Sequence, residues 1–309
     1  MISYNKLFEY LKANGITKTD LANALRLSSA TMAKLSKNET VSLQVIIDIC
    51  NYLHCQPADI IENHDEIKKG SLLYILREEM NHKIKGGLYH NIQIQMAYNS
   101  NHIEGSTLSE DQTRAIYETN TIGLENSVSN VDDIIETVNH FRLFDYMLSQ
   151  SDKPLTQKLI KEFHKILKTS TSDSRLEWFA VGDYKLKVNE VGGNETVAPE
   201  NVEKEMQKLL LDYNNICTKK LSDLLDFHVR FEKIHPFQDG NGRVGRMILF
   251  MECLKYNIIP FIIYDNEKLF YYRGIREYSN DKTFLIETCL SFQDQFKNTL
   301  KYFRINLET

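Results

Sequence analysis

Apolar residues recur at helical spacing along nearly the whole chain. Near the amino terminus, Tyr4, Leu7, Phe8 and Leu11 occupy positions i, i+3, i+4 and i+7, which lie on one face of a helix. Further helices are predicted over 91–104, 131–148, 155–167, 202–213, 221–234, 243–256, 267–278 and 282–303. The pattern therefore predicts a mainly α fold.

One stretch, residues 182–199, departs from the helical repeat. It contains Val188, Val191 and the pair Gly192-Gly193, which is a combination typical of a β-hairpin. We expect a short hairpin here, inserted among helices.

The first 63 residues are predicted to form a small helical domain of their own. Thr17, followed three residues later by Asp20, is a variant of the capping-box signal and opens a short second helix. A tight turn at Leu27-Ser28-Ser29 leads to a third helix over 30–37, and a fourth begins near Ser42. Residues 64–70 are charged, end in glycine and read as a linker to a second domain over 71–309.

This order of helices resembles the Cro/repressor type of helix-turn-helix domain. The resemblance implies that the third helix enters the major groove of DNA, with Ser29, Thr31, Lys34 and Asn38 facing the bases. Residues 1–63 contain six lysines and arginines and six aspartates and glutamates, so they gain little from counterion release on DNA. A homodimer with a few local lysines would suffice for binding; the alternative is a bundle used for self-association or for docking a partner.

Composition and charge limit the remaining classes. A net charge of −5 excludes a protein that coats nucleic acid through a generally basic surface. The five cysteines are odd in number and widely spread, which is typical of reduced thiols. The sequence shows no signal-peptide core and no apolar run of membrane-spanning length, so we expect a cytoplasmic protein without a membrane contact.

The stretch 235–246, which reads HPFQDGNGRVGR, concentrates the candidate chemistry. Pro236 disfavours continuation of the preceding helix, and Gly240, Asn241 and Gly242 come just before the next one. Free backbone N–H groups at a helix N-terminus attract anions, and glycine allows a phosphate to approach closely. Arg243 and Arg246 share a face of that helix, so the segment suits a polyphosphate.

Two further side chains in this stretch suggest a reaction. Asp239 is placed to hold Mg²⁺ against the same phosphates, because Mg²⁺ prefers one or two carboxylates together with phosphate oxygens. His235, with an ordinary pKa near 6.5, can accept a proton from an attacking hydroxyl at neutral pH. The combination implies a metal-bound nucleotide as ligand.

The stretch matches every fixed position of the Fic motif, His-x-Phe-x-Asp/Glu-Gly-Asn-Gly-Arg-x-x-Arg. The resemblance implies a helical protein adenylyltransferase that moves AMP from ATP to a Ser, Thr or Tyr hydroxyl of a target protein. His235 would be the base, Asp239 the Mg²⁺ ligand, Arg243 and Arg246 the phosphate clamps, and Phe237 the anchor of the loop. The implied ATP contacts are Asp239, Gly240, Asn241, Gly242, Arg243, Arg246, Val191, Gly192, Tyr271 and Asn280.

A second motif bears on regulation. Ser100 and Glu104 lie one helical turn apart in a helix expected near 91–105, followed by Gly105. This run resembles the inhibitory motif of Fic proteins, Ser/Thr-x-x-x-Glu-Gly/Asn, of the class whose inhibitory helix precedes the catalytic motif. The resemblance implies that Glu104 pairs with Arg246, and that the hairpin over 182–199 is the flap that covers the nucleotide and pairs with the target's backbone.

Two other functions use the same residues. The reverse reaction, removal of AMP from a modified protein, would need Glu104 to position water and His235 to protonate the leaving hydroxyl. A transcription regulator could instead use the second domain only to sense nucleotide. His140 and His164 are expected to be satisfied structural histidines, and Trp178 a core residue.

Overall fold

The computed structural model describes residues 2–63, 70–123, 129–191 and 193–307. The chain divides into two compact units, Met1–Ile67 and Lys68–Thr309. Most of the predicted linker 64–70, together with Gly192 of the predicted flap, lies outside the described residues. Each unit is described separately.

Five helices and one strand pair build the first unit. Their bounds are α1 Asn5–Ala13, α2 Lys18–Leu25, α3 Ser29–Ser36, α4 Leu43–Leu53 and α5 Pro57–Ile60, with β1 Ile2–Ser3 antiparallel to β2 Glu62–Asn63. Buried Tyr4, Leu7, Leu21, Leu35 and Ile49 form its core. The strand pair ties the two ends of the unit together, a long-range contact that no local pattern predicts.

The predicted capping of the second helix is confirmed. The Thr17 hydroxyl accepts a hydrogen bond from the Asp20 backbone N–H, and the Asp20 carboxylate accepts one from the Thr17 N–H at 2.9 Å. Two of the helix's otherwise free N–H groups are thereby satisfied. Ser28 caps α3 in a similar way, through the backbone N–H of Thr31 at 3.1 Å.

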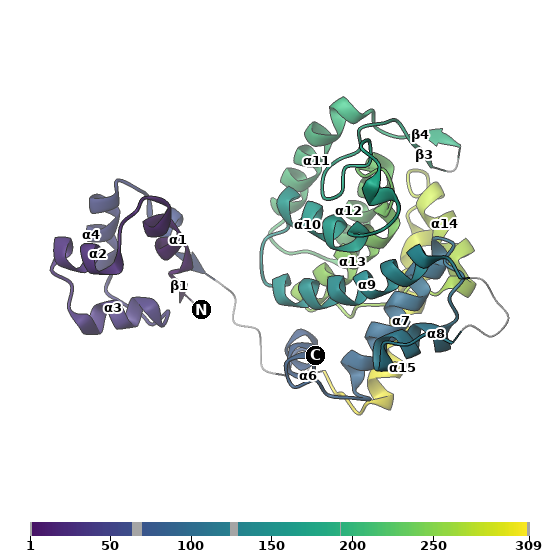
Figure 1. Cartoon of the computed structure of the whole chain (residues 1–309), viewed down its shortest axis with the longest axis horizontal. Coiled ribbons are helices and arrows are strands. Elements are labelled where there is room, and N and C mark those ends of the chain that lie inside the picture. Colours follow the sequence, from purple (N-terminus) through teal and green to yellow (C-terminus); the bar gives the residue numbers. More distant parts are fainter. Residues whose placement is uncertain (1, 64–69, 124–128, 192, 308–309) are drawn as a thin grey trace. The chain divides into compact units, whose positions relative to one another are not determined.

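The second unit is a helical domain with one small hairpin (Figure 1). Its helices are α6 Leu72–Asn81, α7 Leu88–Ile103, α8 Glu110–Thr119, α9 Val131–Gln150, α10 Gln157–Lys168, α11 Pro199–Asn214, α12 Leu221–Ile234, α13 Asn241–Lys255, α14 Lys268–Glu277 and α15 Thr283–Tyr302. Two short 3₁₀ turns, η1 Asp173–Arg175 and η2 Asp265–Glu267, accompany them. The mainly α expectation is confirmed.

Helix α13 lies at the centre of this domain. Every residue from Arg243 to Leu254 is buried, and the helix packs against α6, α7, α9, α10 and α12. A helix that is buried all round must be enclosed by other helices. These neighbours hold α13 in a fixed position, which matters because the motif 235–246 leads into it.

The hairpin is shorter than the segment 182–199 over which it was predicted. Strand β3, Glu190–Val191, pairs antiparallel with β4, Asn194–Glu195. The other described residues of 182–199 are turns, bends and irregular backbone, apart from Pro199, which begins α11.

Trp178, predicted to be core, is 37% exposed, with the Lys187 ammonium 4.2 Å above its ring. The core prediction was wrong because Trp178 sits in an irregular segment rather than on a buried helix face.

Among the described residues, no helix has both the length and the apolarity to cross a bilayer.

Candidate active site

The loop between α12 and α13 is fixed by its own side chains. Phe237 is fully buried and stacks on His164, with ring centroids 4.0 Å apart. The Asn241 amide closes the loop, accepting from the Phe237 N–H and donating to the Phe237 carbonyl, both at 2.8 Å. The expected anchor role of Phe237 is thus visible, while the Asn241 side chain is occupied by the loop and leaves only its backbone for a ligand.

His235 occupies the C-cap of α12 in a left-handed conformation, with φ 51° and ψ 63°. Its Nδ1 lies 3.3 Å from the Glu232 carbonyl oxygen, a contact that suits a proton on Nδ1 and a free lone pair on Nε2. Burial is the main cause that lowers the pKa of His235. At neutral pH the imidazole is therefore the uncharged form that can accept a proton.

The N-terminus of α13 forms the candidate anion site. Gly240 caps the helix with φ 80°, and the N–H groups of the first turn have no partner within a helix. At Gly242, a Cβ atom would lie 2.2 Å from a Glu104 oxygen and 2.8 Å from an Arg246 nitrogen. Only glycine fits here while Glu104 is in place.

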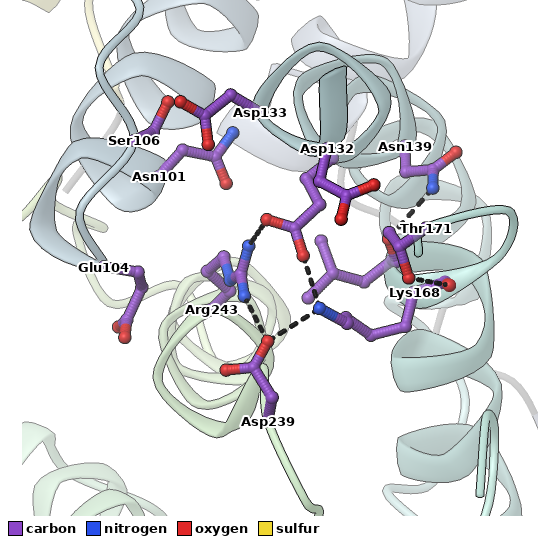
Figure 2. A network of polar contacts seen from close by, with 12 residues as sticks. Asn101, Glu104, Ser106, Asp132, Asp133, Asn139, Lys168, Thr171, Asp239 and Arg243 are labelled. Atoms are coloured by element: carbon purple, nitrogen blue, oxygen red, sulfur yellow. Dashed lines mark hydrogen bonds and ion pairs between the residues drawn. The ribbon is translucent and has the colours of Figure 1, made fainter. Parts of the chain in front are cut away.

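Asp239 lies in a network of charges beside this turn (Figure 2). Its Oδ2 accepts hydrogen bonds from Lys168 Nζ at 2.7 Å and from Arg243 at 3.0 Å, and Figure 2 shows the other oxygen turned away from both. Glu136 joins the same two cations from α9. Arg243, expected to clamp phosphate, is thus turned to two carboxylates.

Lys168 and Glu136 were not identified from the sequence, although one signal was available. Lys168 follows Ile160, Phe163, His164 and Leu167 on the buried face of α10, where a lysine needs a buried acidic partner. The structure provides two acidic partners within 2.7 Å, Glu136, whose side chain is 13% exposed, and Asp239, whose side chain is 44% exposed. A lysine on an apolar helix face is therefore the sequence signal that indicates an ion pair here.

The donors present fit a single-carboxylate Mg²⁺ site. Burial alone would raise the pKa of Asp239, but Arg243 and Lys168 outweigh it and hold that pKa well below its usual range. The carboxylate is therefore ionised at physiological pH, with one oxygen available. No cluster of three or more His, Cys, Asp or Glu that could hold a metal occurs among the described residues, so such an ion would need phosphate oxygens as further ligands.

The Arg246 side chain contacts Ser100 on α7 and Glu104, the C-cap residue of α7. Its guanidinium donates to the Ser100 hydroxyl at 3.0 Å, to the Ser100 carbonyl at 2.9 Å and to Glu104 Oε1 at 2.7 Å. The arginine side chain is 4% exposed and that of Glu104 is 30% exposed. The predicted contact between Glu104 and Arg246 is present, with Glu104 as the C-cap of a helix that spans Leu88–Ile103.

A layer of buried polar groups lies close to Arg246. The Tyr271 hydroxyl is 2.7 Å from His228 Nε2, and one carboxylate oxygen of Glu232, Oε1, is buried without a hydrogen-bond partner among the described residues. Burial raises the pKa of Glu232 to about 8; the positive Arg246 opposes this shift and the negative Glu104 adds to it. Tyr271, predicted to contact the nucleotide, is 2% exposed, and its hydroxyl is occupied by His228.

The other predicted residues are distributed more widely. Val191 is 43% exposed on the hairpin, and Asn280 is exposed beyond the end of α14. In the first unit, Ser29 and Lys34 are exposed on α3, but Asn38 Oδ1 accepts from the Tyr4 N–H at 2.8 Å. His164 Nδ1 accepts from the Gly182 N–H at 3.0 Å, but His164 Nε2 has no hydrogen-bond partner among the described residues. Neither ring nitrogen of the fully buried His140 has one there either, so the expectation of satisfied histidines was wrong for His140 and half met for His164.

Family models match a part of each unit. The profile of the Fic/DOC family matches residues 154–253, and that of the Cro/C1-type helix-turn-helix DNA-binding domain matches residues 6–66. The first match contains the whole stretch 235–246, and the second contains helices α2 to α5 and all of α1 except Asn5.

Named relatives match part of the chain at modest identity. The protein adenylyltransferase Fic of Nematostella vectensis is 28% identical over 190 residues, which are 59% of this chain and 42% of that protein. The protein adenylyltransferase fic-1 of Caenorhabditis elegans is 24% identical over 213 residues, covering 65% of this chain and 40% of that protein. The matches thus cover less than half of the length of these relatives.

Solved structures show the same fold. A Fic domain containing signaling protein from Bacteroides thetaiotaomicron aligns with a TM-score of 0.58 and 18% identity over 77% of this chain and 98% of that one. Fic-1 from Caenorhabditis elegans aligns with a TM-score of 0.57 and 17% identity over 92% of this chain and 82% of that one. At these identities the comparison supports the architecture, and the chemistry must be argued from the site.

Proposed function

We propose that this chain, which carries a Fic/DOC family domain beside a Cro/C1-type helix-turn-helix domain, is a protein adenylyltransferase. It would transfer AMP from ATP to a Ser, Thr or Tyr hydroxyl of a target protein. The relatives named protein adenylyltransferase support the reaction type, and the geometry of 235–246 supports the residues.

His235 would act on the attacking hydroxyl. With Nδ1 held toward the Glu232 carbonyl, Nε2 is the atom that accepts the hydroxyl proton as the oxygen attacks the α-phosphorus. The bond to pyrophosphate breaks on the opposite side, and pyrophosphate leaves. The neutral imidazole, favoured by burial, is the competent form.

The N-terminus of α13 would hold the phosphates. Its first-turn N–H groups and the absence of a side chain at Gly242 allow a close approach, and Arg246 would contact the terminal phosphate once Glu104 has left. Mg²⁺, when bound at Asp239, would neutralise phosphate charge. Lys168 and Arg243 hold the Asp239 carboxylate in place.

Glu104 would keep this site at rest. An arginine paired with a carboxylate at 2.7 Å cannot hold a phosphate at the same time. ATP would then bind with its α-phosphorus out of line for attack. The single observation that supports regulated transfer most directly is this contact, because it occupies the phosphate-binding arginine with a side chain from another helix.

The test is a labelling experiment. Wild type, Glu104→Gly and Glu104→Gly combined with His235→Ala are incubated with α-labelled ATP, Mg²⁺ and a cell lysate, and labelled protein is followed by electrophoresis. We expect faint labelling by wild type, strong labelling by Glu104→Gly and none by Glu104→Gly combined with His235→Ala. Equal labelling with and without His235 would refute the assignment.

Removal of AMP is the second candidate, and the position of Glu104 favours it. The carboxylate lies against Gly242 at the mouth of the anion site, where it could orient a water molecule. A purified AMP-modified target distinguishes the two directions. Loss of label that requires both His235 and Glu104 would support removal, while label loss that does not depend on Glu104 would count against it.

The first unit is proposed to bind DNA through α3. Ser29 and Lys34 are exposed there, and Thr31 lies between them. The neutral charge balance of residues 1–63 makes two copies on a two-fold site the expected arrangement. Target identity and operator sequence are matters for experiment.

A further inference from the structure

The end of α7 carries Glu104, so whatever fixes this end sets the strength of the inhibitory contact. Polar contacts from two directions fix it. On the α9 side, the Asn101 amide donates to the Thr137 hydroxyl at 3.2 Å, and both side chains are buried. On the α14 side, a set of partly exposed contacts converges on Asp265, the first residue of η2.

Asp265 makes three contacts, two with α7 and one with α14. Its Oδ2 lies 2.9 Å from His102 Nδ1, two residues before Glu104. Its backbone N–H donates to Asn99 Oδ1 at 3.0 Å, also on α7. Its Oδ1 accepts from Lys268 Nζ at 2.8 Å, at the start of α14.

The orientation of these groups is determined by their surroundings. Asn99 is 4% exposed, and its amide nitrogen donates to the Gln95 carbonyl at 2.9 Å, which leaves Oδ1 to face Asp265. The Tyr272 hydroxyl adds a donor to the Ile103 carbonyl at 3.3 Å. Burial alone would raise the pKa of Asp265, but Lys268 and His102 lower it, so the carboxylate is charged at neutral pH.

We propose that Asp265 is a positioning residue of the inhibitory helix: its bridge from η2 to His102 and Asn99 holds the end of α7 where Glu104 meets Arg246. Asp265 touches neither Arg246 nor the loop 235–246 through any of these contacts. Its loss would weaken inhibition while every residue of the proposed catalytic site remains. The proposal rests on the proposed function, because inhibition is read as AMP transfer.

The variants are Asp265→Ala, which removes the carboxylate, and Asp265→Asn, which keeps its size and loses its charge. Asp294→Ala is a matched control, because Asp294 forms an i,i+3 ion pair with Lys297 at 2.7 Å, as Asp265 does with Lys268 at 2.8 Å. Each variant is made in the full chain, alone and combined with Glu104→Gly. Transfer from α-labelled ATP and amide hydrogen exchange of residues 95–104 are measured.

We expect Asp265→Ala to raise transfer about fivefold, less than Glu104→Gly, since partly exposed contacts contribute less than a buried arginine pair. Asp265→Asn should fall between Asp265→Ala and wild type, and Asp294→Ala should match wild type. In the Glu104→Gly background, Asp265→Ala should add nothing. Exchange of 95–104 should accelerate in Asp265→Ala, while that of 131–150 stays unchanged.

The outcomes distinguish failure of the positioning role of Asp265 from failure of the proposed function. If Glu104→Gly is active but Asp265→Ala transfers at the wild-type rate, the positioning role is wrong and the proposed function stands. If no variant transfers AMP, the proposed function fails, and the exchange of 95–104 then decides: unchanged exchange in Asp265→Ala overturns the bridge as well. A general loss of fold in Asp265→Ala would appear as faster exchange in 131–150, and Asp265→Asn would then decide the question.

Discussion

At the scale of single residues, His235 shows how the backbone prepares a side chain for chemistry. It is the non-glycine C-cap of α12 and adopts a left-handed φ of 51°, a conformation that turns the chain into the loop. The preceding carbonyl of Glu232 faces Nδ1, so the tautomer is determined by the helix end itself. Pro236 then prevents return to helix.

We predict that His235→Ala abolishes AMP transfer and leaves ATP binding nearly intact, because the imidazole acts on the hydroxyl and not on the phosphates. Transfer from labelled ATP and isothermal titration with ATP in the Glu104→Gly background measure the two properties separately. Loss of ATP binding together with transfer would assign His235 to the nucleotide instead.

A pH profile gives an independent reading of the same residue. Burial lowers the pKa of His235, so the neutral base persists at acidic pH where an ordinary imidazole, with a pKa near 6.5, would be protonated. The transfer rate of Glu104→Gly should therefore be level from pH 8 down to 6.5 and decline only below that. A decline that begins above pH 7 would contradict this environment.

Lys168 allows a prediction about stability. Its ammonium is 3% exposed and pairs with Glu136 and Asp239 at once, so Lys168→Ala leaves these two carboxylates with Arg243 but without their second shared cation. We expect a loss of about 3 kcal/mol in the free energy of unfolding. Chemical denaturation measures it, with the exposed Lys297→Ala as a control that should change stability by less than about 0.5 kcal/mol.

At the scale of elements, Arg246 of α13 joins that helix to the end of α7 by binding Ser100 and Glu104. Wild type is expected to populate the productive arrangement at about one per cent, which corresponds to a gap of about 2.7 kcal/mol, within reach of a partly buried charge-assisted pair. We predict that Glu104→Gly raises transfer, including self-modification, by up to about a hundredfold. Initial rates at saturating ATP and Mg²⁺ measure the gain.

Arg246→Ala is the informative counterpart. It also breaks the contact with Glu104, yet it removes the group expected to hold the terminal phosphate, so transfer should fall rather than rise. Equal rates for wild type and Glu104→Gly would show that α7 is a structural helix only.

The sequence predicts elements here better than it predicts contacts. Residues 221–234 were expected to form a helix and do so, because Leu224, Leu225, Phe227 and Phe231 supply a clear buried face. The strand pair β1–β2 and the irregular setting of Trp178 depend on packing between distant segments, which spacing along the chain does not encode.

The same distinction holds for the candidate site: the sequence indicates the reactive groups but not the side chains that orient them. The motif 235–246 indicates the base, the anion site and the arginines, and the inhibitory run indicates Glu104. The partners that orient them, Lys168 and Glu136, come from α10 and α9 and have no sequence link to the motif. Asn38 and Asn241 read as ligand contacts, but their side chains hold backbone in place.

At the scale of the whole molecule, two compact units occupy one chain. We predict that removal of residues 1–63 spares AMP transfer, since all proposed site residues lie beyond them, and eliminates binding to the DNA upstream of the chain's own gene. Transfer assays and electrophoretic shifts on the shortened chain test the two halves separately.

Lys34 provides a finer test of the same idea. Lys34→Ala should weaken the shift and reduce its dependence on salt by about one ion. Lys37→Ala, a neighbouring exposed lysine just past the end of α3, is the comparison. No shift by wild type at low salt would favour a docking module over a DNA-binding domain.

Gly242 has a consequence for how this protein could change under selection. The same missing side chain admits the Glu104 carboxylate in the resting state and the phosphates in the working state, because both approach the first turn of α13. A mutation at 242 that expels the carboxylate also obstructs the nucleotide. In a genetic screen for hyperactive alleles, gain-of-function changes should accumulate at 104 and in the contacts that support it, and position 242 should yield only loss-of-function alleles.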